Sequence, residues 1–456
     1  MSKRPIYITL IIMIFISTLS PESNLDSYLK QGMKNNLALQ QKGFELKKSI
    51  EALKEAKAMF LPTVSIEARY SRAGGGRTID MPIGDLINPV HNTLNQLLLA
   101  HSQTPYFPAN IENQSIPFLR KTDQETKLRV IQPIFISSLF YNKKIKKKLV
   151  DINKVSINLY KEELKLNIKT AYYNHLKTLK VKELLLETKI LLNENIEISK
   201  SLFRNGKVTE EVLLRSKAEL SSLNKELYKA EKNIILSASY FNFLLNLPMD
   251  SKIKIDKLIS EPVYTDKKID SLINTASSKR LELENLNNAM IISEQTINLH
   301  KSSILPTISA VFDYGIQGEN YHLAKDSDYW MGSLVLNWNI FNGGKDKSKK
   351  AQAILDKKKL EKQKEEVIKQ ISLSVKSAYY NLFETKKSLN ANKDILKARR
   401  KGFDIITKKY KQGMLPQIEF IQSRKNFTEA KIMYAINIYD LYIKKAELEK
   451  AVSGGK

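Results

Sequence analysis

The sequence repeats itself, and this repeat restricts the possible folds more than any other feature of the chain. Leu61-Pro62-Thr63 recurs as Leu305-Pro306-Thr307, which lies 244 residues further on. Ala171-Tyr172-Tyr173-Asn174 recurs as Ala378-Tyr379-Tyr380-Asn381, which lies 207 residues further on. The offset changes only between two predicted β-strands, so a duplication with one loop of different length explains the pattern.

Each half of the repeat contains two segments in which apolar and polar residues alternate. A period of two indicates β-strands with one apolar and one polar face. In the second half this alternation fills residues 305–341, and in the first half it starts at Leu61 and ends at Phe135. Charges on the polar face suit a barrel with a wet interior and a lipid-facing exterior. The alternative is a soluble antiparallel sheet with one wet face. The charged residues on this face of the first strand pair are Glu67, Arg69, Lys127 and Arg129.

Long helices fill the rest of each half. Residues 138–205 contain neither proline nor glycine, and as one helix they would extend about 100 Å at 1.5 Å per residue. Gly206 ends this helix, and helical spacing of apolar residues resumes over 209–245. The second half repeats the plan with helices over 345–412 and 417–452. A short turn between two long helices predicts an antiparallel coiled-coil hairpin in each half.

A shorter helical segment precedes each strand pair. The first covers residues 24–60, and the polar pair Asn35-Asn36 predicts a break within it. The second covers residues 269–304, where we expect one uninterrupted helix.

The chain therefore divides into two structural repeats with short flanking segments. Residues 1–23 combine Lys3 and Arg4 with an apolar run too short for a comfortable transmembrane helix, which is typical of a secretory signal peptide. Residues 71–124 hold a run of three glycines and five prolines, so we expect an irregular loop with one short helix at 94–99. The predicted boundaries are a signal peptide over 1–23, a first repeat over 24–250, a connector over 251–268, a second repeat over 269–452 and a tail over 453–456.

Composition excludes several classes of site. The chain has no cysteine, which excludes disulfides, thiol nucleophiles and thiolate metal sites. Its five histidines are scattered, so we expect no metal site and no cofactor, and no set of residues predicts an enzyme. The net charge of +26 comes from lysines interleaved with glutamates along helices, which favours a solvated helical surface over a nucleic-acid partner.

Four strands are too few to close a barrel. An open four-stranded sheet in lipid would leave unpaired backbone groups at its edges, at several kcal/mol for each group. Three copies would supply twelve strands, which is enough for a barrel with an aqueous lumen. The sequence therefore predicts a mainly α-helical protomer whose four strands complete a trimeric barrel.

Short motifs in this order resemble the TolC-type outer-membrane efflux proteins over essentially the whole chain after the signal segment. The marks are the two Ala-Tyr-Tyr-Asn motifs given above, together with Gln132-Pro133-Ile134-Phe135, Asn339-Ile340-Phe341-Asn342-Gly343-Gly344, Phe203-Arg204-Asn205-Gly206 and Tyr410-Lys411-Gln412-Gly413. The resemblance implies the TolC-type fold, which is a homotrimer with a twelve-stranded barrel in outer-membrane lipid and a long helical duct in the periplasm. It also implies the exit duct of a tripartite efflux or type I secretion system, with a periplasmic adaptor and an inner-membrane pump as partners.

The same resemblance implies a gate at the periplasmic end of the duct. By position Tyr410 matches the gate tyrosine of the family, and Glu419 matches a constricting aspartate. Gln422 stands where a second aspartate is common, so a double acidic ring is not expected here. Three copies of Glu419 around an axis would form a carboxylate ring that attracts cations. A glutamate in the first turn that stabilises the helix dipole is the structural alternative.

Position in the chain singles out three further sets of residues. The turns at Asn205-Gly206 and Gln412-Gly413 need left-handed backbone, and the resemblance makes them adaptor-docking tips. Gly343 and Gly344 form the expected hinge between the last strand and the following helix. The expected aromatic belt at the membrane interfaces consists of Tyr70, Tyr314, Trp330 and Trp338.

A second class of function uses the same elements. A periplasmic coiled-coil scaffold or adaptor with soluble sheets would also have long helical hairpins. Such adaptors normally carry one helical hairpin rather than two whole repeats that flank strand pairs, so the sequence favours the duct.

Overall fold

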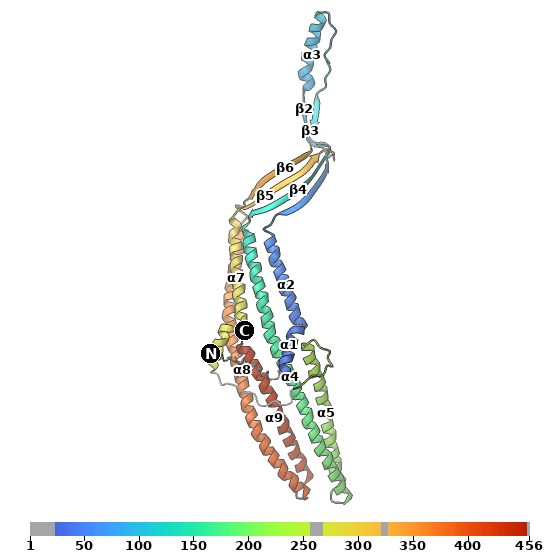
Figure 1. Ribbon diagram of the computed structural model, residues 1–456, viewed down its shortest axis with the longest axis vertical. Helices are drawn as coiled ribbons and strands as arrows, with labels where there is room; N and C mark the ends of the chain where they lie inside the picture. The colour runs from blue at the N-terminus through green and yellow to red at the C-terminus, as the bar shows by residue number, and fades with distance from the viewer. Residues whose placement is uncertain (1–22, 256–267, 321–326, 454–456) are drawn as a thin grey trace, which may run out of the picture. The chain divides into compact units, whose positions relative to one another are not determined.

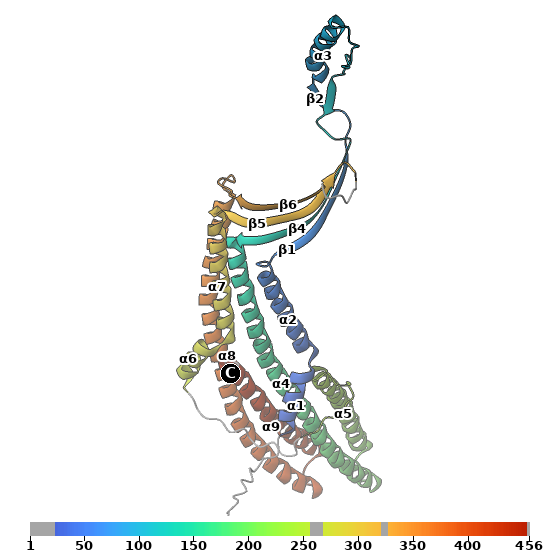
Figure 2. The same ribbon diagram turned by 45° about the horizontal axis from the view of Figure 1, so that its top comes forward.

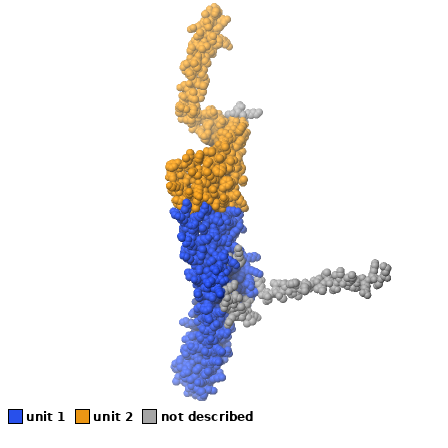
Figure 3. Space-filling view, turned by 90° about the vertical axis from the view of Figure 1, so that its left-hand side faces the viewer, with its two compact units in different colours: residues 1–51, 147–294, 354–456 blue, residues 52–146, 295–353 orange. Residues whose placement is uncertain are grey.

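The computed structural model describes residues 23–255, 268–320 and 327–453. Residues 1–22 of the predicted signal peptide, most of the predicted connector over 251–268 and the last three residues lie outside these ranges. The chain forms two compact units, which Figure 3 colours separately. Unit 1 comprises residues 1–51, 147–294 and 354–456, and unit 2 comprises residues 52–146 and 295–353. In the part of the chain that is described, every helix is too short or too polar to cross a membrane.

Unit 2 is built on a four-stranded antiparallel sheet (Figures 1 and 2). Its strands are β1 (Thr63–Arg72), β4 (Thr122–Phe135), β5 (Thr307–Gly318) and β6 (Asp328–Asn337). The order is β1-β4-β5-β6, so the two predicted strand pairs lie side by side in one sheet. The pairing also confirms the predicted alternation, because Val64, Val130 and Phe312 fall in one row across the sheet. Within the described chain β1 and β6 form its edges.

The predicted irregular loop over 71–124 is wrong in its central part. This segment contains β2 (Thr78–Met81), α3 (Ile83–Ala100) and β3 (Gln114–Pro117), and β2 pairs with β3. The helix has 18 residues and includes Pro89, whereas the sequence pattern predicted a helix only at 94–99. Side chains of the helix bond the backbone further along the chain: Asn88 exchanges two hydrogen bonds with the backbone of Ile111, of 2.9 and 2.8 Å.

Most of the helical residues belong to unit 1, and the two halves repeat. The first half has α1 (Asn24–Asn35), α2 (Leu37–Ala58), α4 (Ser137–Arg204) and α5 (Glu210–Leu244). The second half has α6 (Ile269–Lys279), α7 (Leu281–Lys301), a 3₁₀ turn (Ser302–Ile304), α8 (Lys345–Lys411) and α9 (Gln417–Val452). The long predicted helices are confirmed to within a few residues.

The prediction of one unbroken helix over 269–304 is wrong, because the chain leaves helical geometry at Arg280 (φ −64°, ψ 128°). The equivalent residue in the first half, Asn36, has nearly the same angles (φ −59°, ψ 123°). Both N–H groups donate a 3.0 Å hydrogen bond to the carbonyl four residues earlier. The Arg280 guanidinium donates to the carbonyl oxygen of Ala451 at 2.9 Å. Tertiary contacts therefore hold a break that the arginine side chain does not itself predict.

Within unit 1 the helices α5, α4, α9 and α8 lie in a row. The His175 ring on α4 contacts Ser237 on α5, and Lys177 on α4 pairs with Asp440 on α9 at 2.8 Å. The rings of Phe403 on α8 and Phe420 on α9 lie 5.8 Å apart. The largest buried cluster of unit 1 includes Ile168, Tyr172 and Phe241. Gly32 on α1 packs closely against it, because a Cβ there would meet the Cδ1 of Ile168 at 2.4 Å.

Candidate functional site

The apolar face of the sheet in unit 2 is open. Its large side chains are mostly more than half exposed, including Ile66 at 76%, Leu334 at 72% and Trp330 at 72%. A soluble protein covers the apolar face of a sheet with other parts of its core. The arrangement here is the reverse, because Asp313 on the polar face is fully buried whereas most large side chains of the apolar face are exposed. This is the polarity of a sheet that faces lipid on one side and an aqueous lumen on the other.

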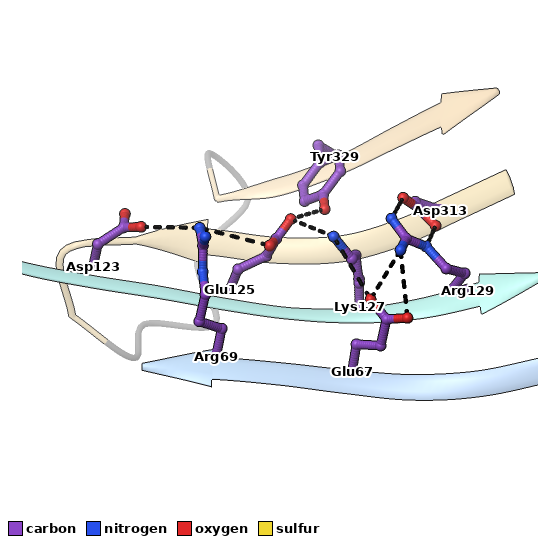
Figure 4. Close-up of polar contacts among 8 residues, drawn as sticks. All are labelled: Glu67, Arg69, Asp123, Glu125, Lys127, Arg129, Asp313 and Tyr329. Carbon is purple, nitrogen blue, oxygen red and sulfur yellow. Dashed lines mark hydrogen bonds and ion pairs between the residues drawn. The ribbon is translucent and has the colours of Figure 1, made fainter. Parts of the chain in front are cut away.

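Charged groups on the polar face form one connected network (Figure 4). Arg129 donates to both oxygens of Asp313, at 2.8 and 2.7 Å, and pairs with Glu67 at 3.1 Å. Lys127 pairs with Glu125 at 3.0 Å, and Arg69 pairs with Asp123 at 3.4 Å. The acids and bases of β1, β4 and β5 therefore neutralise one another along and across neighbouring strands. The polar face of the sheet therefore presents alternating positive and negative charges rather than charge of one sign.

Gly315 sits in the middle of this face because a side chain has no space there. A Cβ at this position would meet the carbonyl oxygen of Thr126 at 2.5 Å and the Cβ of Lys127 at 2.6 Å. Tyr329 pairs with Gly315 in the sheet register, and its hydroxyl donates to Glu125 at 2.5 Å. The tyrosine thus extends past the glycine to β4, which links three strands on the polar face.

The four residues of the predicted aromatic belt lie in two groups. Tyr314 and Trp330 are direct cross-strand partners, and Tyr70 pairs with Gln124 near the same end of the sheet. Trp338 follows the opposite end of β6, where its indole nitrogen donates to the carbonyl oxygen of Ile304 at 2.9 Å. All four side chains are more than half exposed. The belt itself stays a prediction.

The two helix tips of unit 1 have the same backbone turn. Gly206 and Gly413 have φ angles of 65° and 74°, as the sequence predicted. The N–H of Lys207 donates to the Leu202 carbonyl at 2.9 Å, and the N–H of Met414 donates to the Lys409 carbonyl at 3.0 Å. Hydrogen bonds of this kind close a helix on a left-handed glycine. The hinge glycines before α8, Gly343 and Gly344, are also left-handed, with φ of 67° and 81°.

A buried polar cluster joins the two helical hairpins near these tips. The amide nitrogen of Gln417, at the start of α9, donates to the Ser216 hydroxyl on α5 at 2.6 Å and to the Ser199 hydroxyl on α4 at 3.0 Å. Asn195 on α4 donates to the same Ser216 hydroxyl at 3.2 Å. We call Asn195, Ser199, Ser216 and Gln417 the tip cluster, and each is at most 7% exposed.

Tyr410 lies beside the tip cluster. Its ring stacks on Phe420 with centroids 4.8 Å apart. Burial raises the pKa of Tyr410, and the nearby Ser199 and Gln417 oppose that effect. The hydroxyl is buried and makes no hydrogen bond of good geometry to the described residues. The side-chain oxygens of Asn195 and Gln417 are also buried without a partner in the described chain.

The structure does not bring the three predicted gate residues together. Tyr410 packs against the inner face of α9, whereas Glu419 and Gln422 are exposed on the opposite face of that helix. Gln422 donates to Asn426 at 2.9 Å. An acidic ring and the tyrosine contact would therefore act on different sides of α9.

Sequence reasoning missed the tip cluster and the ion pair beyond it. Arg424 is 4% exposed and donates to Glu219 on α5 at 2.9 Å. Burial lowers the pKa of Arg424, and Glu219 works in the opposite direction. Polar residues at core positions of an otherwise apolar helical stripe were the available signal. Across the described residues no group of three or more histidine, aspartate or glutamate side chains is placed to hold a metal ion.

Comparison with known proteins agrees with this geometry. The sequence pattern of the outer membrane efflux protein family matches residues 272–454, which is the second repeat. The chain is 20% identical over 453 residues to outer membrane protein TolC of Salmonella enteritidis, and the match covers 96% of this chain and 83% of that protein.

Solved structures share the fold. The CmeC outer membrane channel of Campylobacter jejuni has a TM-score of 0.75 at 16% identity, over 95% of this chain and 86% of that one. The outer membrane protein VceC of Vibrio cholerae has a TM-score of 0.74 at 12% identity, over 94% of this chain and 95% of that one.

The fold is that of solved outer-membrane channel proteins, and the open apolar face suits a sheet that lies in lipid. The second repeat matches the outer membrane efflux protein family, and the whole chain is similar to TolC, which places it in the outer membrane. Its relatives are channels rather than enzymes.

Proposed function

We propose that this chain is the exit duct of a tripartite efflux or type I secretion system. Three copies close a twelve-stranded barrel in outer-membrane lipid, and their helices form the duct through which substrates pass from an inner-membrane pump. The chain carries no catalytic function in this proposal, because the pump supplies the energy. The observation that carries it is the open apolar face of the sheet, which a soluble periplasmic scaffold would have to cover.

The edges of both units support association of several copies. In unit 2 the edge strands β1 and β6 each have one side without a partner strand in the described chain. In lipid such an edge costs several kcal/mol for each unpaired backbone group, so β1 of one copy should pair with β6 of the next.

In unit 1 the outer helices of the row, α5 and α8, each have two apolar stripes. One stripe packs within the chain, through Leu223 and Leu227 on α5 and through Ile371 and Val375 on α8. The other stripe lies on the opposite side of each helix and is exposed. Its members are Leu214, Tyr228, Ile235 and Phe243 on α5, and Leu355, Leu373, Tyr380 and Ile405 on α8. Packing of α5 from one copy on α8 from the next would bury both stripes.

The test is the state of the protein in the outer membrane. We expect outer-membrane extracts to contain a particle of three chains that dissociates on heating. Leu373→Arg places a charge in the exposed stripe of α8 and should prevent this particle, whereas Ser374→Arg on the neighbouring exposed position should not. A wild-type chain that is recovered as a soluble periplasmic monomer would overturn the proposal and favour a scaffold.

The proposed gate uses residues at the tips. Tyr410 and the tip cluster hold the α8–α9 hairpin against the α4–α5 hairpin, and Glu419 and Gln422 face the lumen. The turns at Asn205-Gly206 and Gln412-Gly413 dock the periplasmic adaptor, and Gly343-Gly344 turn the chain from the barrel into the duct. Support comes from the buried hydrogen bonds of Gln417 and from the exposure of Glu419.

Single-channel recording tests the lumen position of Glu419. Glu419→Ala should reduce cation selectivity and weaken block by divalent cations, because three carboxylates would be lost from one ring. Glu449→Ala, at an exposed position on another side of α9, is the control and should leave both unchanged. Identical recordings from Glu419→Ala and the wild-type channel would remove this residue from the gate.

A further inference from the structure

The segment between β1 and β4 contains a helix with a free heptad face. Ile83, Val90 and Leu97 are seven residues apart on α3, and Leu86, Thr93 and Ala100 form a second set with the same spacing. Together they give the alternating three- and four-residue steps of the a and d positions in a coiled coil. Leu86, Val90 and Leu97 are 69%, 56% and 54% exposed. This stripe is the a/d face of α3.

The other side of α3 is occupied by its own chain. Asn88 and Asn95 are also seven residues apart, and both bond the backbone of the returning segment, Asn95 through Phe107 at 2.8 and 3.0 Å. His91 contacts the carbonyl oxygen of Pro108 at 2.6 Å. At Gly84 a Cβ would lie 2.0 Å from the carbonyl oxygen of Ile111. The returning segment therefore packs on the b and f positions and fixes which face of α3 stays open.

Charge separates this segment from the rest of the chain. Residues 78–119 contain no lysine or arginine, although the mean content of the chain, 74 in 456, predicts about seven. A helix that lies on an anionic membrane surface normally carries lysine and arginine on its polar face. The polar face of α3 therefore lacks the lysines and arginines that would bind it to lipid headgroups. The a/d face has no like charges that would repel a second copy.

We propose that the a/d faces of α3 from three copies pack together as a parallel three-helix bundle. This inference rests on the proposed trimer, which brings three copies of the β1–β4 segment around one axis. A helix of 18 residues gains most of its stability from packing, so the three copies of α3 need to be held close together to associate. Tethering through the barrel supplies the missing association strength, because linked segments meet at effective concentrations of about millimolar.

The chain has no cysteine of its own, so a single introduced cysteine is the only thiol in each variant. Val90→Cys places a thiol on the a/d face, and Asn92→Cys places one on an exposed position on another side of the same helix. Both are purified as full-length protein from outer membranes and treated with a mild oxidant. We expect Val90→Cys to give disulfide-linked pairs that include up to two of every three chains, and Asn92→Cys to remain single chains. Leu97→Cys is a second variant on the same face and should behave like Val90→Cys.

Light scattering of each sample before oxidation separates the two proposals. A trimer in which Val90→Cys and Leu97→Cys form no more linked pairs than Asn92→Cys would overturn the bundle and leave the duct intact. A wild-type particle of one chain would overturn both.

Discussion

The two helix tips of unit 1 have the same backbone and different side chains. The turn hydrogen bonds at Gly206 recur 207 residues later at Gly413. The first residue of α5 is Glu210, which is exposed, whereas its equivalent at the start of α9 is Gln417, which is buried between α4 and α5. Ser216 accepts the amide of Gln417, whereas its equivalent, Ser423, takes no part in the tip cluster.

This difference shows that the two copies of a duplicated hairpin keep the same backbone turn while their side chains take different roles. The backbone turn is retained because both hairpins need to reverse over a few residues. The side chains have divided the work, since the first repeat supplies the hydroxyl acceptors and the second supplies the inserted amide. The second tip is therefore hydrogen-bonded to the first. Substituting equivalent residues in the two repeats shows which of them stabilise this contact.

The largest effect is expected at Arg424. Arg424→Ala leaves Glu219 without its partner in a mostly buried place, and we expect a loss of about 2 kcal/mol, below the range for fully buried pairs because Glu219 is 34% exposed. The equivalent residue in the first repeat, Lys217, is exposed, so Lys217→Ala should change stability by less than about 0.5 kcal/mol. Thermal melting of both purified variants measures the difference. Equal losses would contradict the asymmetry.

An intermediate effect is expected at Gln417. Gln417→Ala removes two buried hydrogen bonds between the hairpins and should cost about 1 kcal/mol. The control is Glu210→Ala at the equivalent exposed position. Melting curves measure stability, and single-channel recording should also show longer openings for Gln417→Ala because the hairpins are less firmly joined. Unchanged openings with reduced stability would leave the cluster a purely structural role.

The smallest effect concerns pH. The first repeat has His175 after its Ala-Tyr-Tyr-Asn motif, where the second has Leu382. Burial lowers the pKa of His175 below its ordinary value of 6.5. The unfolded chain therefore takes up a proton as the pH falls below about 6.5 while the folded chain resists it, so stability falls there by less than the one-proton limit of about 1.4 kcal/mol per pH unit.

His175→Leu copies the second repeat and should flatten this dependence, as measured by melting temperatures between about pH 5.5 and 7.5, the range in which an ordinary histidine titrates. His101→Gln, at an exposed position, is the control and should keep the wild-type slope. A wild-type slope in His175→Leu would assign the pH dependence to other groups.

Sequence alone predicted the parts of the fold that depend on local periodicity. Residues 417–452 are helical to the residue, and the strand alternation placed Val130 and Phe312 on one face correctly. The features it missed depend on contacts between distant segments. The helix α3 was hidden by Pro89 and its asparagines, whose partners lie 12 to 23 residues further along the chain.

The candidate site shows the same limit. Glycines with positive φ were predicted because left-handed backbone requires them, and Gly413 confirms this. Gln417 stands at a core position of α9, but its hydrogen-bond partners are two hydroxyls more than 200 residues earlier, which the sequence pattern does not identify. The roles of Tyr410 and Glu419 in a gate stay predictions.

Two backbone hydrogen bonds join the ends of the segment that contains β2, α3 and β3, and they make this segment replaceable. The N–H of Phe118 donates to the Arg77 carbonyl at 3.0 Å, and the N–H of Ala73 donates to the Lys121 carbonyl at 3.0 Å, so both ends of the inserted segment are stapled together before it begins. The register of β1 with β4 is set by pairs from Thr63–Ile131 to Arg72–Thr122, and it does not depend on the residues inserted between these hydrogen bonds. The position is therefore a suitable junction at which the inserted segment can be exchanged, or a reporter peptide grafted, without changing the pairing of β1 with β4.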